Sequence, residues 1–512
     1  MSLTFLKEIL VNCLVMASVD VLAPIITRMV NSSLVSGCVP DNWKIALVLP
    51  LIKKLGLELV QENFRPVSNL PFVSKIAEKA VIPQVLDHCS KHAPLPSNQS
   101  SYRQHHSTET ALLRVQNDIL LSMDRQEVTL LVLLDLSAAF DTIDHSILAD
   151  LLETDFGISN VALSWIKSFV RGRKQRVTIK QEQSRNFSVL SGVPQGSCLG
   201  PLLFIMYASR LFHVVEKHLP VVHVFADDTQ LYLSFRPTSS ISQDQAIRAM
   251  EECIVDVRAW MCHNMMKLND SKTEFLIIGS RQQLAKINVD SIKVGASEIV
   301  STSSVRNLGA WFDKNMSMDA HVGKVCSKAF FGLYKIRQIR KFLSVDATNT
   351  LVHAFVTSHV DYCNSLLYGV SQYQLSRLQR VLNAAARITC LLPRYSHITP
   401  TLFHLHWLPI ASRIKFKIAL IVYKALNGYS PSYITDLLHI KPPGRYAMRS
   451  DDQHLLLVPR TKCKTFGDRA FAVAGPRVWN SLPLAVRNSV NVDTFKTNLK
   501  SFLFTQAYKH II

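Results

Sequence analysis

The stretch VVHVFADDTQLYLSF, Val221–Phe235, decides the fold that this sequence predicts. Two apolar runs rich in β-forming residues flank the adjacent acids Asp227 and Asp228, a pattern typical of a β-hairpin with a polar tip. Two neighbouring carboxylates repel each other unless a cation lies between them, so this tip is a candidate site for a divalent metal ion. Taken alone, such a pair is more often a solvated turn, and the rest of the chain has to decide between the two interpretations.

A third acid ends the strongest strand pattern of the chain. Thr129–Leu134 (TLLVLL) is a continuous apolar run, typical of a strand buried on both faces, and Asp135 follows it directly. If this strand lies beside the hairpin, three carboxylates converge at one edge of a sheet, where they can hold two Mg²⁺ ions roughly 4 Å apart. Such a site supports phosphoryl transfer, which depends on positioning and charge neutralisation. Asp141 and Asp144 lie beyond the strand end, and we expect them to cap or pair locally.

Charge is distributed unevenly along the 512 residues, which are enough for two or more domains. The net charge is +19, and the part from Trp311 onward carries 27 Lys and Arg against 9 Asp and no Glu. The first 310 residues are nearly balanced, with 30 basic and 29 acidic residues. This asymmetry favours a half that binds a polyanion, nucleic acid above all, over a basic domain that is merely soluble.

The ten cysteines are dispersed and contain no CxxC pair, so neither a zinc site nor a disulfide framework is indicated. An intracellular, reducing setting is therefore expected, without a choice between nucleus and cytoplasm. Ile9–Ile26 is apolar, but Asn12 and Asp20 interrupt it and its apolar residues recur at helical spacing. We expect a buried helix there, with no signal peptide and no transmembrane segment.

The remaining patterns predict an α+β portion that ends near residue 315 and a mainly helical, basic portion after it. Further strands are expected at Trp43–Pro50, Val177–Lys180 and Phe275–Gly279. Helices are expected from about Pro71, and over Thr108–Met123, Val161–Val170, Leu202–Tyr207, Gln243–Trp260, Asp346–Leu366, Leu375–Thr389 and Ser412–Leu426. The basic cluster Arg171–Arg176 is placed before the strand at Val177, and the Gly- and Pro-containing segment Thr465–Pro483 before a last helix.

Several long motifs resemble, in order and spacing, those of reverse transcriptases encoded by non-LTR (LINE-type) retrotransposons. The principal three are LLDLSAAFDTIDH (Leu133–His145), SGVPQGSCLGPLLF (Ser191–Phe204) and FADDTQLYL (Phe225–Leu233). Supporting matches are WKIALVLPLIKK, NFRPVSNLPFVSKIAEK, SYRQHHSTETALLRV, LNDSKTEFLIIG, NLGAWFD and TFGDRAFAVAGPRVWNSLP. The resemblance covers nearly the whole chain. It departs from the family pattern at ASRLFHVVEKHLP and at Cys198, neither of which touches an acid of the proposed site.

The resemblance implies a right-hand polymerase of the α+β class, with fingers, a palm built on an antiparallel sheet, and a thumb. The expected divisions are an N-terminal helical lead-in (1–35), reverse transcriptase fingers and palm (36–312), a thumb-like helical region (313–400) and a mainly helical, basic C-terminal region (401–512). A helix over Ala320–Leu343 would grip the nucleic-acid backbone. Full elements of this kind carry an endonuclease before the polymerase, so the chain is expected to be truncated before the fingers.

The implied activity is that of an RNA-directed DNA polymerase with two Mg²⁺ ions, for which Mn²⁺ can substitute. Its partners would be an RNA template, a DNA primer and dNTPs, with no membrane, and no protein partner can be inferred. The alternative is a catalytically silent or co-opted RNA-binding relic of the same fold. Intact acids at all three positions argue against a decayed site.

Carried over by position, Asp135, Asp227 and Asp228 match the metal-binding triad of the family. Phe140 matches the aromatic gate that crowds a sugar 2′-hydroxyl, although an ordinary core Phe is an open alternative. Gln195 and Gly196 match the loop that supports the template and the incoming nucleotide, where glycine permits close backbone approach.

Two basic positions also match the family. Arg65 matches a fingers residue near the triphosphate or the template, and a surface arginine is its alternative. Lys272 matches the lysine that helps to protonate the pyrophosphate leaving group, and a solvated lysine at a strand edge is its alternative.

Overall fold

The protein was analysed as a computed structural model, which describes residues 17–54, 56–137, 140–180, 182–442 and 454–511. The chain forms two compact units, each assembled from segments that are separate in sequence. The first unit runs to Pro96 and includes Leu136–Val214 and Val257–Leu268. The second unit comprises Ser97–Asp135, Val215–Asp256 and Asn269–Ile512. Each unit combines helices with a β-sheet, which confirms the predicted α+β class.

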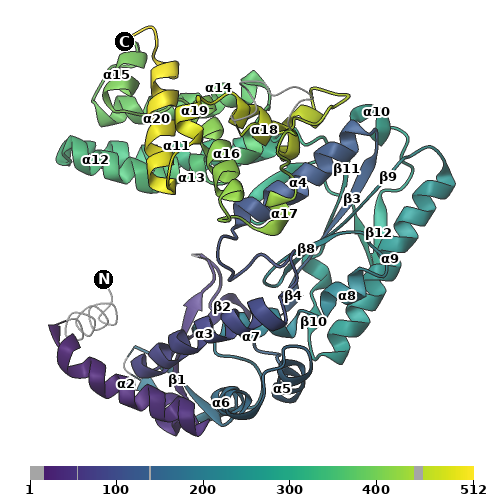
Figure 1. Ribbon diagram of the computed structural model, residues 1–512, viewed down its shortest axis with the longest axis vertical. Helices are drawn as coiled ribbons and strands as arrows, with labels where there is room; N and C mark the ends of the chain where they lie inside the picture. The colour runs from purple at the N-terminus through teal and green to yellow at the C-terminus, as the bar shows by residue number, and fades with distance from the viewer. Residues whose placement is uncertain (1–16, 55, 138–139, 181, 443–453, 512) are drawn as a thin grey trace. The chain divides into compact units, whose positions relative to one another are not determined.

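The sheet of the first unit is built around β1 (Ile45–Ile52), which pairs antiparallel with β2 (Phe64–Asn69) and parallel with β5 (Arg173–Ile179). Two short strands, β6 (Glu182–Gln183) and β7 (Phe187–Val189), pair antiparallel with β5. A separate two-stranded ladder joins β4 (Leu136–Ser137) to β10 (Lys267–Leu268). The helices of this unit are α2 (Val19–Ser36), α3 (Phe72–His92), α5 (His145–Thr154), α6 (Asn160–Val170) and α7 (Gly200–Tyr207) (Figure 1).

The sheet of the second unit has four antiparallel strands in the order β11-β3-β9-β8. Their bounds are β11 (Glu274–Ile278), β3 (Val128–Leu134), β9 (Asp228–Phe235) and β8 (Val222–Phe225). Apolar side chains keep β3 buried along almost its whole length, as its continuous apolar run predicts. Helix α4 (Thr108–Asp124), which begins in a capping box at Ser107, packs against β3 and β8.

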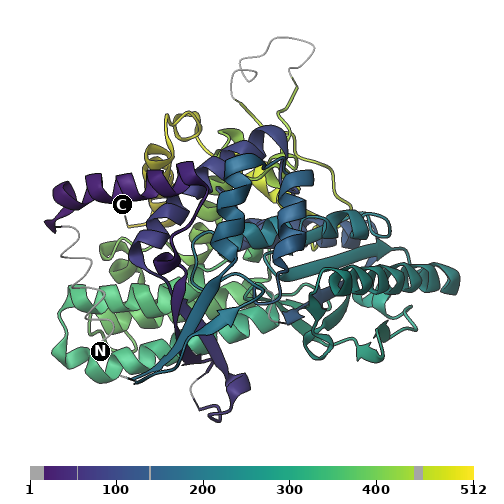
Figure 2. The same ribbon diagram turned by 90° about the horizontal axis from the view of Figure 1, so that it is seen from below.

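The C-terminal helices share one hydrophobic core with α4 and this sheet, through residues such as Leu112, Leu276, Phe312, Leu378 and Phe495. The longer ones are α11 (Asp319–Ile339), α14 (Gln372–Thr389), α16 (Ile410–Leu426) and α20 (Val492–Ala507). Helices α11 and α14 pack against each other, and Figure 2 shows green helices of the C-terminal part of the chain side by side. The shorter ones are α10 (Arg281–Leu284), α12 (Val345–Val352), α13 (Ser358–Asp361), α15 (Thr399–His404), α17 (Ser432–Thr435), α18 (Phe471–Asn480) and α19 (Leu484–Arg487).

The remaining elements are short or run from one unit into the other. Two further hairpins join β12 (Ser291–Val294) to β13 (Ser297–Val300) and β14 (Ser304–Asn307) to β15 (Ala310–Asp313). Helices α8 (Leu211–Val215) and α9 (Ser240–His263) each have residues in both units. Single turns of 3₁₀-helix lie at Asp41–Trp43, Gln61–Asn63, Asp270–Lys272, Arg340–Phe342, Asn364–Leu367 and Gly467–Arg469, and a π-helical turn lies at His353–Thr357.

Two local predictions are wrong. Strand β5 begins at Arg173 rather than at Val177, because the basic side chains of this cluster do not prevent the segment from pairing with β1. The helix expected to be buried over Ile9–Ile26 is exposed in its described part, where Val21 and Ile25 are 69% and 53% exposed; residues 9–16 lie outside the described residues. None of the described helices is long and apolar enough to cross a membrane.

Candidate active site

The predicted hairpin is present, and we call β8, its turn and β9 the catalytic hairpin (Val222–Phe235). Phe225 pairs with Asp228, so Ala226 and Asp227 form a two-residue turn between the strands. Ala226 adopts a left-handed φ of 59°, which tight hairpin turns of this length require. Its backbone N–H donates to Oε1 of the buried Gln99 at 3.2 Å. Asp227 therefore occupies the turn itself, and Asp228 is the first residue of β9.

Strand register brings Asp135 and Lys272 to the same edge of the sheet as Asp228. Leu134, the last residue of β3, pairs with Thr229 of β9, so the next residue, Asp135, stands beside Asp228. On the other side of β3, Leu133 pairs with Glu274 of β11, and the same register places Lys272 beside Asp135. The Lys272 ammonium lies 3.0 Å from Oδ2 of Asp135. Four residues predicted for the site thus stand together in the second unit.

Burial and the acids at this edge of the sheet raise the pKa values of neighbouring groups. The pKa of Asp228 is raised to about 6, first by withdrawal of its carboxyl group from solvent and then by the negative charges of Asp227 and Asp135. Arg306 acts in the opposite direction and is the smallest of these influences. The pKa of Tyr102 is also raised, by burial and then by the charge of Asp227. A cation bound at this edge would relieve the repulsion among the carboxylates.

The donor set at this edge suits a hard divalent cation, because Mg²⁺ prefers carboxylate oxygens. Within the described part of the chain, no three His, Cys, Asp or Glu side chains are gathered as closely as the ligands of one metal ion. Like charges separate unless a cation lies between them, and Lys272 is the cation that pairs with Asp135 here. The residues present fit a divalent metal in chemistry, and their register places them within electrostatic reach of one another.

The remaining predicted residues lie in the first unit, around a segment that we call the glycine loop (Ser191–Gly200). Gly196 has a φ of 134°, and a Cβ atom on it would lie 2.2 Å from the carbonyl oxygen of Ser68 in β2. The backbone N–H of Ser68 donates to the carbonyl of Gln195 at 2.7 Å. Only glycine allows this close approach of the loop to β2. The close approach at Gly196 is made to the protein backbone of β2, and its role toward a template or nucleotide stays a prediction.

Phe140 and the acids that follow it are tied to the glycine loop or to the next helix. The Phe140 ring packs on the buried Phe204 with 5.0 Å between ring centroids, and its carbonyl accepts from the N–H of Val193. Asp141 accepts from Nε2 of Gln195 at 2.9 Å, and burial raises the pKa of Asp141. Asp144 caps α5 by accepting from the N–H groups of Ser146 and Ile147. The expectation that these two acids act locally is confirmed.

Arg65 lies in β2, where it is exposed and faces Leu51 of β1 in the ladder. It belongs to the same strand as Ser68, which holds the glycine loop, so Arg65, Gln195 and Gly196 share one neighbourhood of the first unit. The site residues thus fall into two groups. Asp135, Asp227, Asp228 and Lys272 form one, and Arg65, Phe140, Gln195 and Gly196 form the other.

Glu78 is a residue that the sequence reasoning missed. It lies on α3, is completely buried, and its Oε2 accepts from the Ser197 hydroxyl at 2.6 Å and from the N–H groups of Cys198 and Leu199 at 2.6 and 3.0 Å. The carboxylate therefore satisfies the first N–H groups before α7 and fixes the end of the glycine loop. An acid on the buried face of a helix, beside Ser74 and Ala77, was the available sign.

Comparisons with known proteins identify the family. A family model described as reverse transcriptase (RNA-dependent DNA polymerase) matches residues 52–312, about half of the chain. The chain is 25% identical over 370 residues to the "Probable RNA-directed DNA polymerase from transposon BS" of Drosophila melanogaster, covering 70% of this chain and 39% of that protein. It is also 25% identical over 299 residues to the "RNA-directed DNA polymerase from mobile element jockey" of the same organism, covering 58% of this chain and 32% of that protein.

The chain thus spans between 32% and 39% of the length of these two curated relatives. Among solved structures, the apo telomerase of Candida tropicalis aligns with a TM-score of 0.37 and 12% identity, over 68% of this chain and 62% of that chain. This similarity is too low to support a conclusion about the fold or the site.

Proposed function

This chain belongs to the reverse transcriptase family, and we propose that it is an RNA-directed DNA polymerase that extends a DNA primer on an RNA template with dNTPs. The resemblance to reverse transcriptases of LINE-type elements is confirmed by the family match and by the transposon-encoded relatives. The observation that carries the proposal is the register of the second sheet. Asp135 directly follows β3, Asp228 begins β9 and Lys272 lies shortly before β11, so the three belong to adjacent strands, with Asp227 in the adjoining turn.

Asp135, Asp227 and Asp228 would hold two Mg²⁺ ions, or Mn²⁺ in their place. When bound, these ions activate the primer 3′-hydroxyl and neutralise the charge that develops on the leaving phosphate oxygens. The contribution of the chain is to present three carboxylates from a rigid sheet, so that little reorganisation is needed. Lys272, held beside Asp135, would hold a proton at Nζ and donate it to the pyrophosphate leaving group.

The residues of the first unit would bind and select the nucleotide. The packing of Phe140 on Phe204 fixes its ring, and a fixed ring can crowd the 2′-hydroxyl that distinguishes a ribonucleotide. Gln195 and Gly196 would support the template and the incoming base from a loop that β2 and Glu78 hold in place. Arg65, which is exposed on β2, would contact phosphate through its planar guanidinium.

The helix α11 would hold the duplex of template and primer, in the thumb-like part of the predicted division (36–312, 313–400 and 401–512). Its exposed face carries lysines and aromatic residues at helical spacing, and Lys335 lies 4.6 Å from the centroid of the Phe331 ring. The residues on this face include Lys324, Lys328, Phe331 and Lys335. Lysines in such a row can contact successive phosphates, and this binding weakens as salt rises.

The experiment is primer extension by the full chain on an oligo(dT)-primed RNA with Mg²⁺ and dNTPs. Asp227→Asn should abolish incorporation, because the turn then loses one of the negative charges that hold the metals. Asp290→Asn, at an exposed acid outside the proposed site, is the matched control and should leave incorporation unchanged. Equal incorporation by Asp227→Asn and the wild type would contradict the role of this acid. Retained RNA binding without metal-dependent synthesis would favour a silent relic.

A further inference from the structure

A residue of the C-terminal region is linked by hydrogen bonds to the first strand of the catalytic hairpin. His223 of β8, four residues before Asp227, is completely buried, and its Nε2 lies 2.8 Å from the Ser100 hydroxyl. The same hydroxyl lies 2.7 Å from the hydroxyl of Tyr433 in α17. The rings of His223 and Tyr433 also meet edge to face, with 5.0 Å between their centroids. A tyrosine far along the chain thus reaches β8 through one buried serine.

The second strand of the hairpin is linked to the same tyrosine by a different route. Tyr232 of β9, four residues after Asp228, donates its hydroxyl hydrogen to Oδ2 of Asp118 at 2.8 Å. Arg114 donates to that same oxygen at 3.0 Å. Arg114 also donates to the backbone carbonyl of Tyr433 at 3.1 Å. Tyr433 therefore touches the network of β8 with its hydroxyl and the network of β9 with its carbonyl.

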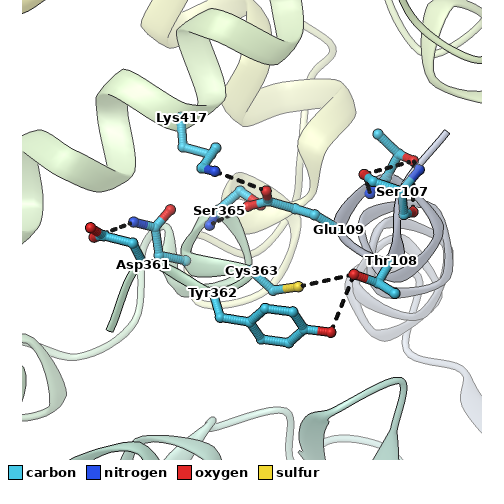
Figure 3. A network of polar contacts seen from close by, with 10 residues as sticks. Ser107, Thr108, Glu109, Asp361, Tyr362, Cys363, Ser365 and Lys417 are labelled. Carbon is cyan, nitrogen blue, oxygen red and sulfur yellow. Dashed lines mark hydrogen bonds and ion pairs between the residues drawn. The ribbon is translucent and has the colours of Figure 1, made fainter. Parts of the chain in front are cut away.

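The second route passes through Arg114 and Asp118 of α4, a helix that C-terminal residues hold at both ends. At its first turn, Glu109 accepts from the Ser365 hydroxyl at 2.6 Å and pairs with Lys417 of α16 at 3.2 Å (Figure 3). At its last turn, Asp124 accepts from the backbone N–H groups of Lys462 and Cys463. Figure 1 shows α17 beside α4, and the Thr110 hydroxyl of α4 lies 3.1 Å from the Tyr433 hydroxyl.

We infer that Tyr433, and with it the C-terminal region, is a positioning element for the catalytic hairpin. The inference rests on the proposed polymerase activity, because it assigns this region a part in placing Asp227 and Asp228. Buried hydroxyl groups that share partners fix one another's geometry, and removal of one leaves the others unsatisfied. A small displacement of β8 against β9 would move both acids, and phosphoryl transfer is sensitive to displacements of this size. Tyr433 touches no reacting atom and acts through Ser100 and Arg114.

The test is Tyr433→Phe in the full chain, which removes the hydroxyl and keeps the ring. Single-turnover primer extension should slow by roughly tenfold, the cost of one lost buried hydrogen bond expressed as a rate. The Kd for primer–template and the KM for dNTPs should stay within about twofold of the wild type. Tyr429→Phe, at an exposed tyrosine that packs against His105, is the matched control and should leave the rate unchanged.

Hydrogen exchange of the backbone amides in residues 222–235 provides a readout that needs no activity. We expect faster exchange in Tyr433→Phe than in the wild type, and no change in Tyr429→Phe. Ser100→Ala breaks the same link from the side of β8 and should reproduce both effects, and the double variant should lose little more than either single one. This second variant decides the matter if Tyr433→Phe does not fold.

The outcomes separate this inference from the proposed function. If the wild type extends primers but both variants leave the rate and the exchange unchanged, the positioning role is wrong and the polymerase activity stands. If the wild type extends no primer but exchange in the hairpin rises, the coupling stands and the proposed function fails. A tenfold or larger loss of primer–template affinity at an unchanged rate would assign Tyr433 to nucleic-acid binding and overturn the inference.

Discussion

The catalytic hairpin of the second unit and the glycine loop of the first unit are held in place by opposite means. At the hairpin, strand register aligns acids whose charges oppose one another, so that the pKa of Asp228 is raised. In the glycine loop, the buried carboxylate of Glu78 accepts from each of three consecutive residues, Ser197, Cys198 and Leu199. The hairpin therefore holds acids that repel one another, whereas the hydrogen-bonding groups of the loop are satisfied by the protein.

Because of this difference, we expect substitutions in the glycine loop and at the hairpin to affect stability and activity differently. Substitutions in the glycine loop remove contacts on which the fold of the first unit depends, so they should cost stability and activity together. Substitutions of the acids at the hairpin remove repulsion, so they should cost activity and leave stability unchanged or improved. The three predictions that follow test this contrast.

Gly196→Ala should have the largest effect. The new Cβ atom would lie 2.2 Å from the Ser68 carbonyl oxygen, and the residue would have to keep a φ of 134°. We expect the free energy of unfolding, measured by urea denaturation, to fall by about 3 kcal/mol, and primer extension to be lost.

Gly428→Ala is the matched control for Gly196→Ala, because Gly428 has a φ of 75° but no atom within 4 Å of an added Cβ. It should cost only about 1 kcal/mol of stability, the price of the backbone conformation alone. Equal losses in the two alanine variants would show that the approach to Ser68 is not what makes Gly196 necessary.

Glu78→Gln should have the next largest effect. The amide keeps the shape of the carboxylate but lacks the charge, and hydrogen bonds to a charged acceptor are the stronger kind. We expect the free energy of unfolding to fall by about 2 kcal/mol and the KM for dNTPs to rise, because the glycine loop loses its anchor. Glu153→Gln, at an exposed acid on α5 of the same unit, should change neither quantity. An unchanged KM in Glu78→Gln would show that the loop keeps its position without this charge.

The residues of the catalytic hairpin are easier to predict from the sequence than the contacts of the glycine loop, for a physical reason. Apolar runs and the acids that end them are local signals, and they placed Asp135, Asp227 and Asp228 at one edge of a sheet before any pairing was known. The interaction of Lys272 with Asp135 follows from register, which depends on the pairing of β11 with β3. The roles of Lys272, Arg65 and Phe140 came from family resemblance alone and stay predictions.

Local sequence patterns do not identify which residues far apart in the sequence come into contact. Glu78 meets Ser197 across 119 positions, and Tyr433 meets Ser100 across 333 positions. In the first case an acid among the buried residues of α3 was a visible anomaly, whereas nothing in the sequence around Tyr433 sets it apart. The strand expected at Val177–Lys180 begins earlier, at Arg173, whose buried guanidinium lies over the Phe169 ring and whose backbone pairs with Val189 of β7.

Asp228→Asn should have the smallest effect on stability, and it should stabilise the protein where the other two substitutions destabilise it. The folded protein holds the pKa of Asp228 at about 6, above the ordinary value near 4, so between these pH values it binds a proton that the unfolded chain does not. The acid therefore stabilises the fold less as pH rises through this window. The asparagine variant should gain up to about 1 kcal/mol above pH 6, after screening by solvent, and nothing below pH 4.

Urea denaturation at pH 4 and pH 7 measures this gain, and Asp290→Asn is the control that should show none. Mg²⁺ supplies the second half of the test, because a ligand that binds only the folded state raises the melting temperature. Added Mg²⁺ should raise the melting temperature of the wild type and have little effect on Asp228→Asn. If the variant is less stable than the wild type at pH 7, the acids at the hairpin do not repel one another, and the contrast with the glycine loop is wrong.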